Sequence, residues 1–137
     1  MKEPVEVERL IVPEMSYKPY FYYNHDFERI IEKIVSNCNY GNLIPHEKVY
    51  FSRGKFANKV DYGERALITL FERNGYYIVY PEEHTFQEQV FYVNTCRFFA
   101  SVGGSCAHNI VFSRSKPQVI ILSRFGGYQT NASIFFK

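Results

Sequence analysis

The chain has 137 residues, of which 46% are hydrophobic and 22% are charged, and its formal net charge is +2. This composition excludes an intrinsically disordered chain, which combines low hydrophobicity with high net charge, and it suffices for one compact core. The near-neutral charge argues against a nucleic-acid-binding protein, since such a protein carries a strongly basic face.

The N-terminal part of the chain predicts a strand, a loop and a helix. A short strand is expected over Val7–Val12, ended by a proline, which cannot donate to a strand ladder. Residues 14–23 predict an aromatic, proline-containing loop. From residue 26 to 38 apolar residues recur at helical spacing on one face, and Asn24 or Asp26 is the candidate N-cap.

Beyond residue 46, apolar segments alternate with helical ones. The expected strands are 48–52, 76–80, 97–102 and 116–123. Continuous apolar strands that alternate with helices are typical of a parallel sheet covered on both faces. The sequence therefore predicts an α/β fold with a Rossmann-like open parallel sheet.

Three helices are expected between these strands. The first has Asp61 as its candidate N-cap and stops at Gly75, because glycine commonly follows the last helical residue. The second begins with Thr85 and Glu88 in a capping-box pattern. The third opens at a glycine pair and runs through Phe112. The apolar face expected for the first helix consists of Ala66, Leu67, Leu70 and Phe71.

Ligands of open parallel sheets bind outside the carboxyl ends of the strands, so the residues that follow each strand are candidates. Arg53 follows the first strand of the sheet, and its guanidinium can bind two phosphate oxygens at once; a solvated arginine is the alternative. Glu82 and Glu83 follow the second strand and could accept hydrogen bonds from ribose hydroxyls, although adjacent acids are usually just solvated.

A glycine pair, Gly103 and Gly104, follows the third strand and opens a helix. Glycines let a phosphate approach a helix N-terminus, whose N–H groups and partial positive charge attract anions. Ser105 adds a hydroxyl donor, and Asn109 lies one turn further along. The alternative is a tight strand-to-helix turn without a ligand. The spacing matches neither G-x-G-x-x-G nor the Walker-type phosphate loop.

The remaining polar residues indicate neither a metal site nor covalent catalysis. Asp26 and Asp61 are the only aspartates, so no Asp-x-Asp pair is available to hold a metal on a diphosphate. The histidines show no metal spacing; His108 could act near a phosphate or as an acid or base, or have no ligand role. The cysteines lack Cys-x-x-Cys spacing and are expected to be small buried side chains.

The order of the motifs carries a resemblance to a known family. The motifs are Val49-Tyr50-Phe51-Ser52-Arg53, Glu64 before a helix, Gly75-Tyr76-Tyr77-Ile78-Val79, Pro81–Gln89 and Gly103–Phe112. Together they resemble the C-terminal half of family 61 glycosyltransferases, which include capsular polysaccharide biosynthesis proteins of bacteria. The sequence departs from the family pattern at Gly103, where many members have histidine, and at Gly63, where asparagine is usual.

The resemblance implies the donor-binding C-terminal lobe of a GT-B glycosyltransferase. It implies transfer of a hexose or pentose from a nucleoside diphosphate sugar to a glycan acceptor, without metal or another cofactor, in polysaccharide or glycoprotein biosynthesis. Residues 1–46 are expected to be a remnant of, or linker from, an N-terminal lobe, and 47–137 the Rossmann-like domain, truncated at its C-terminus. The implied nucleotide-sugar-binding residues are Arg53, Glu82, Gln89, Gly103, Gly104, Ser105 and Asn109.

Two other functions stay open: a non-catalytic binding or assembly module that lost transferase activity, and an unrelated nucleotide-dependent enzyme of this fold. Gln89 could equally pack a helix, and Asn109 could brace its loop. No apolar segment reaches the roughly 18 residues of a membrane-spanning helix, and no signal peptide is expected. The expected location is cytoplasmic, at the membrane face, for a bacterial member and the secretory lumen for a eukaryotic one.

Overall fold

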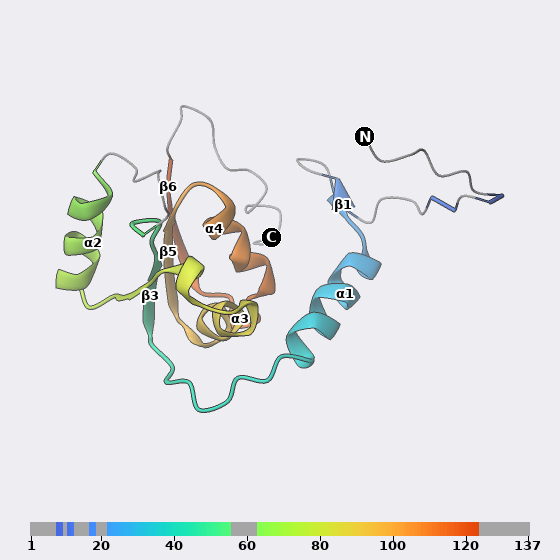
Figure 1. The fold of residues 1–137 in the computed structure, drawn as a ribbon, viewed down its shortest axis with the longest axis horizontal. Helices are drawn as coiled ribbons and strands as arrows, with labels where there is room; N and C mark the ends of the chain where they lie inside the picture. The colour runs from blue at the N-terminus through green and yellow to red at the C-terminus, as the bar shows by residue number, and fades with distance from the viewer. Residues whose placement is uncertain (1–7, 10, 13–16, 19–21, 56–62, 124–137) are drawn as a thin grey trace.

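A four-stranded parallel sheet forms the centre of the protein in a computed structural model, which describes residues 8–9, 11–12, 17–18, 22–55 and 63–123 (Figure 1). The strands are β3 (Lys48–Phe51), β4 (Tyr77–Val79), β5 (Phe98–Val102) and β6 (Gln118–Leu122). Their order across the sheet is β4-β3-β5-β6, and every neighbouring pair is parallel. The predicted Rossmann-like open parallel sheet is therefore confirmed.

The central strand β3 is buried on both faces, which explains its continuous apolar sequence. Val49, Tyr50 and Phe51 are all 0% exposed. Because side chains alternate along a strand, Val49 and Phe51 face one helical layer and Tyr50 faces the other. The first layer contributes the buried residues Phe91, Tyr92, Val93, Cys96 and Ile110, whereas the second contributes Phe71. The sheet is thus the middle layer of three.

Helix α3 (Phe86–Thr95) covers the first face and α2 (Glu64–Arg73) the second, and in Figure 1 they lie on opposite sides of the sheet. Between β4 and α3 the chain forms the short 3₁₀ helix η1 (Pro81–Glu83). Helix α3 begins with the predicted capping box, in which Thr85 and Glu88 exchange hydrogen bonds. Capping satisfies N–H groups that the first turn of a helix leaves without partners.

Helix α2 differs from its prediction in its start and in its buried face. Its N-cap is Gly63, whose φ is +87°, and the predicted cap Asp61 lies outside the described residues. Ala66 and Leu70 belong to the expected apolar face but are exposed, whereas Glu64 is buried. The buried side of the helix is therefore rotated, because Glu64 points to hydrogen-bond donors at the end of β3.

The short helix predicted from the glycine pair through Phe112 is present over this range, but it changes type along its length. It consists of α4 (Ser105–His108), a single helical turn, followed by the 3₁₀ helix η2 (Asn109–Phe112). The macrodipole is a sum over aligned peptide units, so one turn supplies less positive charge at its start than a full helix.

The N-terminal part folds apart from the sheet. Helix α1 (His25–Ser36) is capped by Asn24, as predicted, and contacts η2. Part of the predicted loop is a small antiparallel pair, β1 (Tyr17–Lys18) with β2 (Tyr22–Tyr23). The strand predicted over Val7–Val12 is wrong for its described residues, none of which is in a strand; Ile11 and Val12 are 74% and 77% exposed, so no burial favours extended pairing.

Candidate functional site

The strand order places a topological switch point between β3 and β5. The chain passes from β3 to β4 on one side of the sheet and then returns to the other side of β3 to form β5. At such a point the connections diverge and leave a crevice at the carboxyl ends of the two strands, where ligands of open α/β sheets bind. The two segments that follow these strands, Ser52–Gly54 and Gly103–Ser105, are both sequence candidates.

Arg53 and Gly104 contact each other across this switch point. A Cβ atom placed on Gly104 would lie 2.8 Å from Nη1 of Arg53, so the guanidinium occupies the space that the glycine leaves open. Gly104 also has a φ of +149°, a conformation that other residues rarely adopt. The predicted cation and the second predicted glycine are therefore brought together, at the common edge that their positions after parallel strands suggested.

The buried carboxylate of Glu64 accepts hydrogen bonds from the turn that carries Arg53. Oε1 of Glu64 accepts hydrogen bonds from the Tyr50 hydroxyl at 3.0 Å, from the Ser52 hydroxyl at 2.7 Å and from the Arg53 backbone N–H at 3.1 Å. Gly54 N–H in turn donates to the Ser52 hydroxyl oxygen at 3.0 Å. These bonds fix the turn that carries Arg53, and the sequence interpretation did not assign Glu64 to the site.

Cys106, at the start of α4, is surrounded by several polar groups. Burial raises the pKa of the Cys106 thiol; the charge of Arg53 and a hydrogen bond with Ser105 lower that pKa, and the charges of Glu82 and Glu64 raise it. The predicted Glu82 lies in η1, after the neighbouring strand β4. Ser105 and Glu82 are exposed and accessible from solvent.

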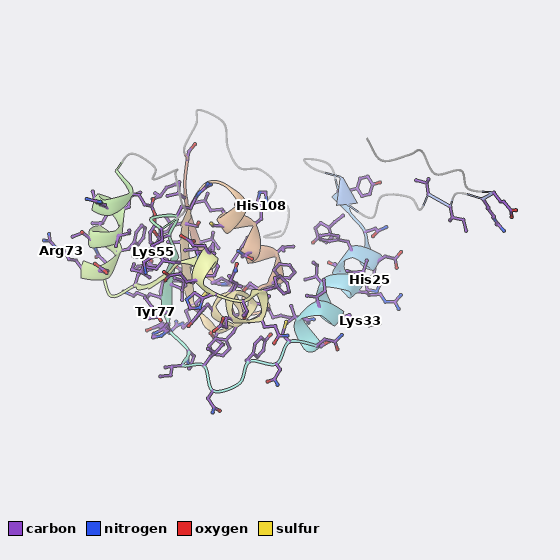
Figure 2. All side chains as sticks on the ribbon, in the orientation of Figure 1. His25, Lys33, Lys55, Arg73, Tyr77 and His108 are labelled. Carbon is purple, nitrogen blue, oxygen red and sulfur yellow. The ribbon has the colours of Figure 1, made fainter. Side chains whose placement is uncertain are left out.

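Lys55 adds a second cation at the edge of the site. Its Nζ pairs with Oε2 of Glu83 at 2.9 Å and lies 4.2 Å from the centroid of the Tyr80 ring. The hydrogen bond that Lys55 donates to Glu83 raises the pKa of Lys55. Figure 2 shows Lys55 near β3 and His108 beside α4, and His108 is exposed.

Gln89 and Asn109, two further sequence candidates, form a structural brace. Nε2 of Gln89 donates to the carbonyl oxygens of Pro81 at 2.9 Å and His84 at 3.1 Å, and its Oε1 accepts from Nδ2 of Asn109 at 3.1 Å. The pair ties the η1 segment to α3 and η2. Both side chains hold these segments together through these bonds, in keeping with the packing and bracing roles that the sequence left open.

Three further observations concern the described part of the chain as a whole. No group of three or more His, Cys, Asp or Glu side chains that could hold a metal occurs there. A cavity of about 370 Å³ lies between α1 and η2, lined among others by Tyr23, Phe27 and Arg114, away from the carboxyl ends of β3 and β5. No described helix has the length and apolarity needed to cross a membrane.

Of three comparisons with known proteins, one finds a match. A family model described as Glycosyltransferase 61 matches residues 1–121. Neither a curated protein nor a solved structure matches the chain. The matched range includes the seven candidate residues and also extends through residues 1–46, ahead of the region that carries the motifs.

Proposed function

The chain belongs to the glycosyltransferase 61 family, and from that premise we propose that its switch-point crevice binds a nucleoside diphosphate sugar and presents the sugar to a glycan acceptor. A glycosyltransferase role follows from the family itself. The donor class, the arrangement as the donor lobe of a GT-B enzyme, and a place in polysaccharide or glycoprotein biosynthesis are parts of the proposal. The division of the chain at residue 46 also stays a prediction.

One observation carries the donor-site proposal: the guanidinium of Arg53 against Gly104 at the point where β3 and β5 end. A diphosphate carries its charge on oxygens that a guanidinium binds two at a time. The glycine lets this guanidinium lie against the main chain of the turn after β5. Glu82, exposed in η1 after the neighbouring strand β4, is suited to accept hydrogen bonds from ribose hydroxyls.

In the proposed reaction the bond between the anomeric carbon and the diphosphate oxygen breaks, and a bond from that carbon to the acceptor oxygen forms. Negative charge develops on the departing diphosphate, and a fixed cation such as Arg53 stabilises it in the transition state. In this proposal Arg53 takes the place of a divalent cation, so the transfer requires no metal. The acceptor hydroxyl loses its proton to a general base, a role that the proposal assigns to no residue.

Calorimetric titration of the chain with UDP and with GDP tests the donor site. We expect saturable binding of at least one of them, and Arg53→Ala should weaken it about 10- to 100-fold, because hydrogen bonds to charged groups contribute about 1.5–3 kcal/mol. Arg73→Ala is the matched control, since Arg73 is exposed in the last turn of α2 (Figure 2) and should leave binding unchanged. A folded wild-type chain that binds neither nucleotide would favour the non-catalytic module.

A further inference from the structure

Glu64 is the one charged side chain among the described residues that is fully buried, with 1% of its surface exposed. Removing a carboxylate from water is costly unless hydrogen bonds replace those of water. A buried carboxylate therefore needs hydrogen-bond donors close by. The donors to Glu64 all lie at the end of β3 or directly after it.

The contacts of Glu64 converge on a single oxygen. Oε1 receives the Tyr50 hydroxyl, the Ser52 hydroxyl and the Arg53 N–H, whereas Oε2 is buried and has no hydrogen-bond partner among the described residues. Tyr50 and Ser52 are themselves 0% exposed. The carboxylate therefore joins the first turn of α2 to the last residues of the central strand and to the turn beyond them.

This connection fixes the arginine at its backbone. The Arg53 N–H is held by Glu64, and the next amide, of Gly54, is held by the Ser52 hydroxyl that Glu64 also binds. A Cβ on Gly54 would lie 2.9 Å from the Ile68 side chain, so the turn is also packed against α2. With its backbone held on one side, Arg53 extends to Gly104 on the other.

We infer that Glu64 is a positioning residue of the transferase, which holds the Ser52–Gly54 turn so that Arg53 meets the donor diphosphate at the switch point. The inference rests on the proposed donor site. Glu64 acts by positioning Arg53 and not by attracting the diphosphate, since a carboxylate repels a diphosphate. An acceptor oxygen at the place of Oε1, and not the negative charge, is therefore what binding requires.

A double-mutant cycle with Arg53 tests the inference, with the nucleotide, UDP or GDP, that binds the wild-type chain. Glu64→Ala should weaken that binding about tenfold, and it should cause no further loss when Arg53→Ala is already present, because Glu64 acts through Arg53. Glu64→Gln keeps an acceptor oxygen and should bind within about threefold of the wild type. Glu72→Ala, at an exposed glutamate of the same helix, is the control and should have no effect.

Amide hydrogen exchange without nucleotide gives a second readout. Exchange at Arg53 and Gly54 should accelerate in Glu64→Ala and stay slow in Glu64→Gln and Glu72→Ala. If Glu64→Ala does not fold, Ser52→Ala takes its place in the cycle, because it removes the bond that links Gly54 to Glu64. Its smaller loss, about threefold, should likewise vanish beside Arg53→Ala.

The outcomes separate the two proposals. Absence of nucleotide binding in the folded wild-type chain removes the donor site, and the inference with it. Wild-type binding that Glu64→Ala leaves intact, or a loss that adds fully to that of Arg53→Ala, overturns the inference and leaves the donor site standing. A loss in Glu64→Gln as large as in Glu64→Ala overturns it too, since the charge would then be the needed property.

Discussion

The sheet with its covering helix α3 and the N-terminal helix α1 have equally clear local sequence signals, but their packing is very different. Helix α3 begins with a capping box and contains four consecutive buried residues, Val90 to Val93. Helix α1 has a capping asparagine and an apolar face at regular spacing, yet none of its residues is buried and Ile30 is 52% exposed. Local signals therefore decide that a helix forms, whereas tertiary partners decide how much it stabilises the fold.

The largest difference between the two regions should appear on truncating an apolar side chain in each. Phe99 in β5 is 0% exposed and packs edge-to-face on Phe51, at a ring-centroid distance of 5.3 Å. Phe99→Ala should lower the free energy of unfolding by about 3–5 kcal/mol. Ile30→Ala in α1 should lower it by less than about 0.5 kcal/mol, because the side chain is half exposed.

Denaturant unfolding, followed by circular dichroism, measures both values. Similar losses in the two variants would show that α1 is as much a part of the folded core as β5, and the contrast between the regions would fail.

A smaller effect is expected from adding one methyl group at the candidate site. Gly104→Ala forces an unfavourable φ and meets Arg53 Nη1 at 2.8 Å, so it should cost about 1–3 kcal/mol of stability. Gly75→Ala is the matched control: Gly75 has a φ of +78° and open space around its Cβ position, so it incurs the backbone cost alone.

Thermal unfolding of both variants isolates the contact with Arg53. The excess loss in Gly104→Ala should fall when Arg53→Ala is added, because the atom that the new methyl meets is then gone. An unchanged excess would mean that the strain at Gly104 has nothing to do with the arginine.

The smallest expected effect is that of removing a helix cap, which can be compared between α3 and α1. The Thr85 hydroxyl oxygen accepts from Glu88 N–H at 3.3 Å, and Asn24 Oδ1 accepts from Phe27 N–H at 3.1 Å. Thr85→Ala should cost about 1 kcal/mol in global unfolding. Asn24→Ala should cost less, since α1 can fray without opening the sheet.

The pH dependence of the melting temperature tests whether the capping box of Thr85 and Glu88 stabilises the fold. Hydrogen bonds from the Thr85 backbone and hydroxyl lower the pKa of Glu88 below its usual 4.5. Stability from the ionised Glu88 is therefore complete above pH 4.5 and is lost as the pH falls through the lowered pKa. The melting temperature of Glu88→Gln should approach that of the wild type in this acid range; a constant gap would contradict the assignment.

The alternation of strands and helices was predictable because each element carries its own signal. Apolar runs such as Val49–Phe51 form strands buried on both faces, and Thr85 with Glu88 marks a helix start. The common edge of Arg53 and Gly104 also followed from the sequence, since residues after parallel strands lie at the same edge of a sheet. Their direct contact depends on β5 lying next to β3, which only the structure shows.

Glu64 was not predictable as a buried residue, because apolar patterning assigns a glutamate to the solvent side of a helix. Its burial depends on three donors that lie 11 to 14 residues earlier in the chain and that only the folded sheet brings together. One signal was present: Glu64, before a helix, is one of the motifs that carry the resemblance to the family. The predicted strand over Val7–Val12 failed for the opposite reason, since its described residues have no buried face.

The brace between Gln89 and Asn109 has a consequence for the conditions under which the site keeps its shape. Its members are neutral amides and main-chain carbonyls, which gain and lose no protons over the range in which proteins stay folded. Salt, which screens ion pairs such as Lys55 with Glu83, leaves these bonds intact. The connection of η1 to α3 and η2 should therefore keep its geometry when pH or ionic strength changes, whereas the pairing of Lys55 with Glu83 should weaken as salt is added.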